Sequence, residues 1–181
     1  TASWVLLEMC RHPQYWPELH AEIDALFEKE KQLSMNAQRD IPLLEGFMRE
    51  SLRMHPPLNT LTRRALYDFE YKGYRVEAGK NVMVCPHIAH RLPEVFPNPD
   101  LFDPRRPAPE NVFATIAFGG GRHKCIGNAF AMLQVRTIFC CLLHEYDFAL
   151  TAPPESYKET MPTVILRPTS PCRVRYRRRK R

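Results

Sequence analysis

Phe118-Gly119-Gly120-Gly121-Arg122-His123-Lys124-Cys125-Ile126-Gly127 is the stretch of this chain that says most about its fold. Three consecutive glycines and several cationic side chains lead into Cys125, and the apolar residues over 126–145 predict a long helix directly after it. A helix N-terminus and neighbouring cations both favour the thiolate, the form of cysteine that binds metals and attacks electrophiles. The glycines let the backbone approach a flat, bulky group. On these residues alone, the stretch fits a redox cysteine, a phosphate-binding loop or one side of a haem pocket.

The composition is that of a globular protein with enough residues for one sizeable core. The chain has 181 residues, of which 44% are hydrophobic and 25% charged. Its 17 prolines gather in 86–109 and 153–171, which predicts ordered coil there. Six cysteines without a CxxC pair give no zinc-binding spacing. No signal peptide and no apolar run of about 18 residues is present, and Thr1 stands inside a helix-like run, so we expect a fragment.

The net charge of +6 is concentrated in cationic residues between Arg173 and Arg181. Such a tail can bind nucleic acid or a membrane surface, but no stacking platform or nucleic-acid-binding signature accompanies it. We therefore expect a solvated terminus and no nucleic-acid partner. A nucleic-acid-binding protein is the alternative, and it would lose a steeply salt-dependent DNA affinity on deletion of 177–181.

Hydrophobic periodicity predicts several helices. Residues 1–10 read as the end of a helix that stops before Pro13, and 14–31 and 41–54 each show an apolar stripe at 3.6-residue spacing. A short helix is predicted near 87–91. The residues of the 126–145 helix expected to face inward are Phe130, Leu133, Ile138, Leu142 and Leu143.

The remaining segments predict small antiparallel sheets and coil. We expect 69–76 to pair with 80–84 around the turn Glu77-Ala78-Gly79. Residues 93–112 are predicted as proline-rich coil, and a coil this long inside a domain is held by specific bonds or has a function. The segment 160–177 is predicted as a hairpin around Pro168-Thr169-Ser170-Pro171.

Glu50 and Arg53 lie three residues apart on the 41–54 helix, so they share a face and can pair. The spacing alone is common on helix surfaces. The arginine-rich part of the coil, Phe102-Asp103-Pro104-Arg105-Arg106, could bring a second guanidinium to the same carboxylate. A buried Glu flanked by two Arg would pin the coil to the helix, and breaking it would cost about 3–5 kcal/mol.

Three motifs in this order resemble the cytochrome P450 family: Glu50-x-x-Arg53, Phe102-x-Pro104-x-Arg106 and Phe118-x-x-Gly121-x-x-x-Cys125-x-Gly127. The resemblance implies a mainly α fold with small antiparallel β-sheets, the C-terminal part of the P450 fold. It implies that 1–181 is a single-domain fragment, the haem-binding half. It also implies that Glu50, Arg53 and Arg106 form the family's structural triad.

A narrower resemblance is to sterol 14α-demethylases. It rests on the stretch from Phe118 to Gly127, on Leu52-Arg53-Met54-His55-Pro56-Pro57, on Arg175-Tyr176-Arg177-Arg178 and on Thr1-Ala2-Ser3-Trp4. It implies a haem-thiolate monooxygenase that oxidatively removes the 14α-methyl group of a sterol. Two alternatives stay open: a P450 monooxygenase acting on another lipophilic substrate, and a non-catalytic haem-thiolate binding module.

The same resemblance implies a haem b whose iron, the only metal expected, is axially ligated by Cys125. His123 and Arg63 would bind the haem propionates, since cationic side chains suit carboxylates. The other residues expected to bind the cofactor are Phe118, Gly121 and Gly127. The residues expected to line the substrate pocket are Leu58, Thr60, Leu61, Met161 and Val164.

The expected partners are a sterol or other lipophilic small molecule and a redox partner, either a ferredoxin or a P450 reductase. Arg122 and Lys124 would offer positive charge to an acidic electron donor. The family's proton-delivery residues would lie upstream of Thr1, so we expect no catalytic residue within the fragment and no turnover by it alone. Membrane association is expected only through a missing N-terminus, giving a cytoplasmic protein if bacterial and an endoplasmic reticulum membrane protein if eukaryotic.

Overall fold

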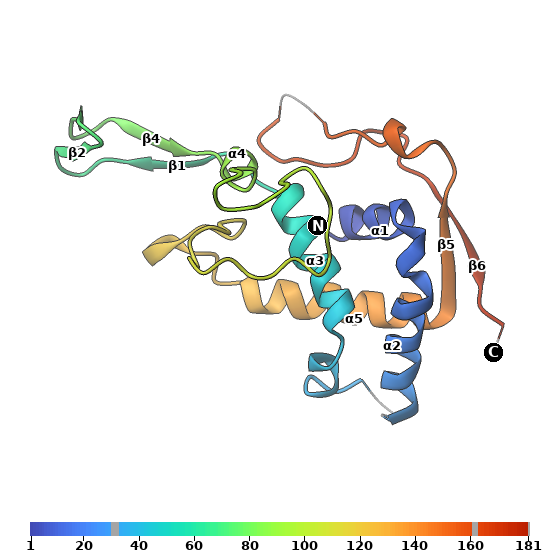
Figure 1. Ribbon diagram of the computed structural model, residues 1–181. Coiled ribbons are helices and arrows are strands. Elements are labelled where there is room, and N and C mark those ends of the chain that lie inside the picture. The colour runs from blue at the N-terminus through green and yellow to red at the C-terminus, as the bar shows by residue number, and fades with distance from the viewer. Residues whose placement is uncertain (30–32, 161–162, 181) are drawn as a thin grey trace.

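The computed structural model of the chain describes residues 1–29, 33–160 and 163–180. Figure 1 shows a group of helices, with one β-ribbon projecting away from them and a second sheet on the opposite side. The α-helices are α1 (Ala2–Arg11), α2 (Trp16–Lys29), α3 (Pro42–Met54), α4 (Pro86–Ala89) and α5 (Asn128–Glu145). Short 3₁₀ turns cover Pro13–Tyr15, Ala37–Arg39, Gly121–His123 and Pro154–Ser156. The helices predicted from periodicity are confirmed to within a few residues.

The main core lies where α1, α2, α3 and α5 meet, because each helix presents an apolar stripe to the others. The stripes predicted for α2 and α3 are confirmed. The buried residues they supply include Leu19, Ile23, Leu26, Leu44, Phe47, Met48 and Leu52. Among the helices of the described residues, none combines the length and the apolar character that crossing a bilayer requires.

The inward face predicted for α5 is partly wrong. Phe130 is 68% exposed and Ile138 is 41% exposed, whereas Phe139, Cys140 and Leu143 are buried. This helix is apolar on several sides, so periodicity alone could not select the face that packs against α2 and α3. Its first half therefore presents apolar side chains to the outside, close to Cys125.

The strand pairing predicted around Glu77-Ala78-Gly79 is also wrong. β1 (Leu61–Arg64) pairs with β4 (Asn81–Val84), and β2 (Phe69–Tyr71) pairs with β3 (Tyr74–Val76), both antiparallel. Lys72 and Gly73 have φ values of 48° and 80°. Two consecutive positive φ angles make a tight two-residue hairpin turn, which splits the segment read as one strand. β1 and β4 form the projecting ribbon in Figure 1.

The hairpin predicted for 160–177 is wrong as a whole. β6 (Val174–Arg178) pairs with β5 (Tyr146–Leu150), the strand that follows α5 directly. Glu159 forms a bridge with Pro168, and the N–H groups of Thr160 and Thr169 donate to the carbonyl oxygens of Arg167 and Lys158, both at 2.8 Å. Residues 167–169 therefore pair with 158–160, and no hairpin turn centres on 168–171.

Most of the basic tail is exposed, as we expect for a solvated terminus, but part of it also pairs with the rest of the chain. Arg177 pairs with Asp147 at 2.9 Å, and Arg179 pairs with Asp24 of α2 at 2.6 Å. Arg179 also donates to the carbonyl oxygen of Leu143 at 2.9 Å. The tail therefore consists of the strand β6, followed by Arg179, which binds residues of α2 and α5.

Candidate haem-binding site

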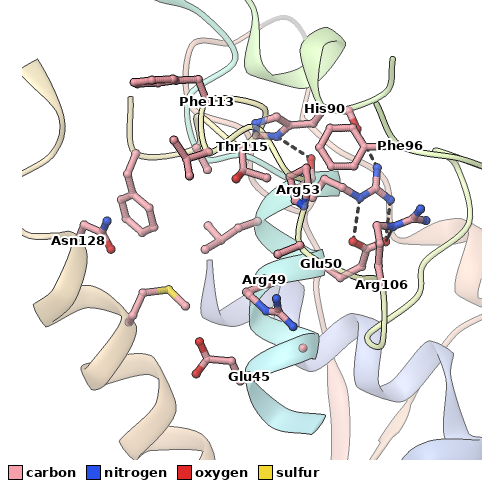
Figure 2. A pocket seen from close by; sticks show the side chains of 18 of the residues that line it. Glu45, Arg49, Glu50, Arg53, His90, Phe96, Arg106, Phe113, Thr115 and Asn128 are labelled. Carbon is pink, nitrogen blue, oxygen red and sulfur yellow. Dashed lines mark hydrogen bonds and ion pairs between the residues drawn. The ribbon is translucent and has the colours of Figure 1, made fainter. Parts of the chain in front are cut away.

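Glu50 is the centre of a buried ion-pair cluster on α3. Its Oε2 accepts from Nε of Arg53 at 2.8 Å, and its Oε1 accepts from Nη2 of Arg53 at 2.7 Å. Nε of Arg106 and the backbone N–H of Asp103 donate to the same Oε1 at 3.0 and 3.1 Å. Burial raises the pKa of Glu50, but these donors outweigh it and hold the pKa below its ordinary value. Figure 2 shows both guanidinium groups turned toward this carboxylate.

The two arginines extend the cluster into the proline-rich coil. Arg53 donates to the carbonyl oxygen of His90 at 2.9 Å, and Arg106 donates to those of Pro97 and Leu101 at 2.6 and 2.8 Å. Backbone carbonyl groups that accept no hydrogen bond within a helix or strand thus accept one from a charged arginine. The three residues that the sequence singles out come together, and the 93–112 coil is fixed to α3 by them.

Gly46 lets the coil lie directly on α3. A Cβ atom at this position would stand 1.9 Å from the carbonyl oxygen of Pro104. No side chain fits there without displacing the backbone of the coil. Sequence reasoning missed this residue, although a glycine inside a helix, which costs about 1 kcal/mol against alanine, was the available signal.

His90, also missed from sequence, connects α3 to the residues before the glycine loop. It is fully buried. Its Nε2 accepts from the backbone N–H of Ile116 at 2.9 Å, so the ring proton resides on Nδ1, which donates to the carbonyl oxygen of Arg53 at 3.0 Å. Burial lowers the pKa of His90 to about 4, which keeps the ring neutral. A neutral histidine therefore fixes the loop that leads to Cys125.

The glycine loop places Cys125 just before α5. Gly119 and Gly121 have φ values of 74° and 64°, a backbone region that favours glycine. The N–H of Cys125 donates to the carbonyl oxygen of Phe118 at 2.9 Å, which closes the loop. α5 begins at Asn128, two residues later than predicted. The Cys125 side chain is exposed.

The surroundings of Cys125 fit a large, flat, apolar group bound through sulfur. Ile126 is 103% exposed and Phe130 is 68% exposed, so the apolar side chains that follow Cys125 in the chain are largely uncovered. Exposed apolar surface of this kind marks a binding site. Within the described ranges, no three His, Cys, Asp or Glu side chains gather as a metal site.

The two residues expected to hold the propionates are both exposed. His123 ends the 3₁₀ turn Gly121–His123, two residues before Cys125. Arg63 lies in β1, where its Nη1 donates to the carbonyl oxygen of Thr62 at 2.8 Å. Their role in binding haem stays a prediction.

A cavity of about 590 Å³ lies between α3, the coil, the glycine loop and the start of α5. Figure 2 shows Glu45 and Arg49 of α3 on one side of it and Phe113 and Asn128 on another. Gly119, Gly120 and Gly121 line it as well, but Cys125 does not. The cavity therefore lies on the α3 side of the glycine loop and is distinct from the exposed thiol.

The expected substrate-lining segments lie side by side. Leu58 forms an antiparallel bridge with Ile165, and the N–H of Asn59 donates to the carbonyl oxygen of Val164 at 3.0 Å. Leu58, Val164 and Ile165 are 38%, 66% and 61% exposed.

Two other expected lining residues are partly buried. Thr60 precedes β1 and Leu61 begins it. Met161 lies outside the described residues.

Comparisons with known proteins agree on one family. A family profile described as Cytochrome P450 matches residues 1–175. The chain is 43% identical to a protein named sterol 14alpha-demethylase from Mycolicibacterium vanbaalenii, over all of this chain and 41% of that protein. It is 34% identical to an obtusifoliol 14-alpha demethylase from Sorghum bicolor, over 99% of this chain and 39% of that protein.

A third relative is cytochrome P450 4c21 from Blattella germanica, 35% identical over 81% of this chain and 30% of that protein. The chain thus spans less than half the length of these relatives. Together with the profile match over 1–175, these similarities show that the chain belongs to the cytochrome P450 family.

Proposed function

We propose that this chain is the haem-binding part of a haem-thiolate monooxygenase that removes the 14α-methyl group of a sterol. The observation that carries the proposal is the exposed thiol of Cys125, held in a glycine loop and followed by the exposed apolar side chains of Ile126 and Phe130. Membership of the cytochrome P450 family supports haem as the group that covers them.

Cys125 would ligate the iron, and His123 and Arg63 would bind the propionates. When bound, a haem with a thiolate ligand supplies the oxidation of unactivated carbon by molecular oxygen. The contribution of this chain is to hold that ligand in place. The bond from the Cys125 N–H to Phe118 fixes the loop, and His90 and the Glu50 cluster fix the segments that lead into it.

Two observations support a sterol as the substrate. Two relatives that match nearly the whole chain are named sterol 14alpha-demethylase and obtusifoliol 14-alpha demethylase. The exposed apolar side chains of Leu58, Val164 and Ile165 suit a lipophilic ligand. The exposed Arg122 and Lys124 beside Cys125 suit an acidic electron donor, a ferredoxin or a reductase domain.

A P450 that oxidises another lipophilic substrate is the second candidate. The 35% identity to cytochrome P450 4c21 favours it, because that relative is not named as a sterol demethylase. The two hydroxyl side chains of Thr60 and Thr62 in the expected lining segment also favour it.

Incubation of the intact gene product with a redox partner, oxygen and a 14α-methyl sterol tests the proposal. We expect the 14-demethylated sterol and formate in equal amounts, measured by mass spectrometry. A haem-loaded, reducible protein that leaves 14α-methyl sterols unchanged but hydroxylates fatty acids or terpenes would support the second candidate and contradict sterol demethylation.

A further inference from the structure

A buried histidine at the end of α3 lies between two carboxylates from distant parts of the chain. Nδ1 of His55 is 2.6 Å from Oε1 of Glu159, and Nε2 of His55 is 3.0 Å from Oε1 of Glu8 on α1. The His55 side chain is only 8% exposed. The ring of Trp4 stacks on it, with the centroids 3.9 Å apart and the planes 5° from parallel. None of these four residues is proposed to bind the haem.

The two contacts fix the protonation state of the ring. A carboxylate only accepts hydrogen bonds, so each ring nitrogen of His55 must donate, and the ring is an imidazolium. Burial disfavours the charged ring, but the hydrogen bonds of Glu159 and Glu8 outweigh it and raise the pKa of His55 above its ordinary value. The same bonds outweigh burial at the carboxyls and lower the pKa of Glu8 and of Glu159.

Other charged or titratable groups also face this cluster. They are Arg11 at the end of α1, His12 directly after it and, on or just after α4, His87 and Arg91. Arg11 lies 2.6 Å from Glu8, whereas His87 lies 3.8 Å from Glu159, and burial lowers the pKa of His87. His55 is thus the closest cation to Glu159. Its deprotonation would leave that carboxylate without a charged hydrogen-bond donor at short range.

Glu159 belongs to the part of the chain that supports an expected pocket wall. It forms an antiparallel bridge with Pro168, and a second bridge joins Ile165 to Leu58. The carbonyl of Val164 accepts from the residue after Leu58, at 3.0 Å. Whatever holds Glu159 therefore also fixes how the segments around Leu58 and Val164 lie relative to α1.

We propose that His55, as an imidazolium, is a positioning residue that ties Glu159 to Glu8 and so fixes the two apolar segments around Leu58 and Val164 for sterol binding. The inference rests on the proposed function, because sterol contact with these segments is part of it. His55 itself touches no substrate. As the pH rises through the raised pKa, the ring loses a proton, one of its two bonds is lost, and the segments loosen.

Hydrogen exchange in the haem-loaded intact protein measures the loosening directly. The reporters are the backbone amides of Asn59, Thr160 and Leu166, each bonded within these segments. We expect their protection, corrected for intrinsic rates, to fall as the pH rises above about 6.5, the ordinary pKa of histidine, through the raised pKa of His55. Glu159→Gln keeps the shape but removes a charge that raises the pKa of His55. In this variant the protection of the three reporter amides should fall at lower pH than in the wild type. Near neutrality they should exchange about tenfold faster than in the wild type.

Glu155→Gln is the matched control, because Glu155 is an exposed carboxylate in the neighbouring 3₁₀ turn. We expect it to behave as the wild type. The dissociation constant of a 14α-methyl sterol, read from the haem absorption change, should rise about tenfold over the same pH range and earlier in Glu159→Gln.

Protection that does not change with pH, or equal protection in Glu159→Gln and Glu155→Gln, would overturn the inference. If protection falls with pH but the dissociation constant of the sterol does not change, the positioning role is overturned, while sterol demethylation still stands. If the wild type binds no 14α-methyl sterol, the proposed function fails, and hydrogen exchange alone then decides whether His55 holds Glu159.

Discussion

Replacement of Glu50 by glutamine tests whether its ion-pair cluster stabilises the site. The variant keeps the size of the side chain but removes the charge that faces Arg53 and Arg106, whose side chains are 2% and 11% exposed. Its amide NH₂ group would also point donors at donors. Removing one partner of a buried ion pair costs about 3–5 kcal/mol, and with two nearly buried guanidinium groups left behind we expect Glu50→Gln to fall in that range.

The free energy of unfolding, measured by urea denaturation at matched haem content, is the assay. Glu18→Gln is the control, because Glu18 pairs with Arg105 while both side chains are more than half exposed. Exposed pairs contribute little, so we expect no measurable change there. A loss of less than about 1 kcal/mol in Glu50→Gln, or equal losses in both variants, would refute the reasoning, because it would mean that the two arginines find water instead.

Three further substitutions test the contacts that hold the coil and the glycine loop against α3. Gly46→Ala should destabilise the protein by about 1–3 kcal/mol and lower haem retention, because the new methyl group would displace Pro104; unchanged denaturation and retention would contradict the close approach. The pKa of His90, lowered to about 4, predicts that stability falls by about 1.4 kcal/mol per pH unit as the pH drops from about 6.5 toward 4, because the unfolded chain then binds the extra proton. His90→Gln should lose that part of the slope in denaturation series, and an unaltered slope would exclude His90 as its source. Arg106→Ala should lower the thermal unfolding midpoint clearly and Arg105→Ala should not, and equal shifts would argue against pinning of the coil by Arg106.

The helices and the Glu50 cluster could be predicted from sequence because their signals are local. The apolar stripe of α3 repeats every 3.6 residues, and Glu50 and Arg53 share one face of it. The pairing of Arg106 with Glu50 could be predicted only from the family motifs, because 56 residues separate the two.

The elements that sequence reasoning missed depend on distant partners or on apolar residues without a preferred face. His90 and His55 bind groups 26 and 104 residues away, so neither carries a signal of its own. Phe130 was expected inside because α5 is apolar on several sides. β6 pairs with β5, a strand more than 20 residues earlier in the chain, and not with the segment directly before it. No local turn signal indicates this pairing.

The haem-ligand role of Cys125 is tested most directly by the absorption spectrum of the reduced carbon-monoxide complex of the intact protein. We predict that Cys125→Ser loses the thiolate-type Soret band. Cys141→Ser, which alters another exposed thiol on α5, should keep the band at wild-type intensity. A thiolate-type band retained in Cys125→Ser would contradict iron ligation by this residue.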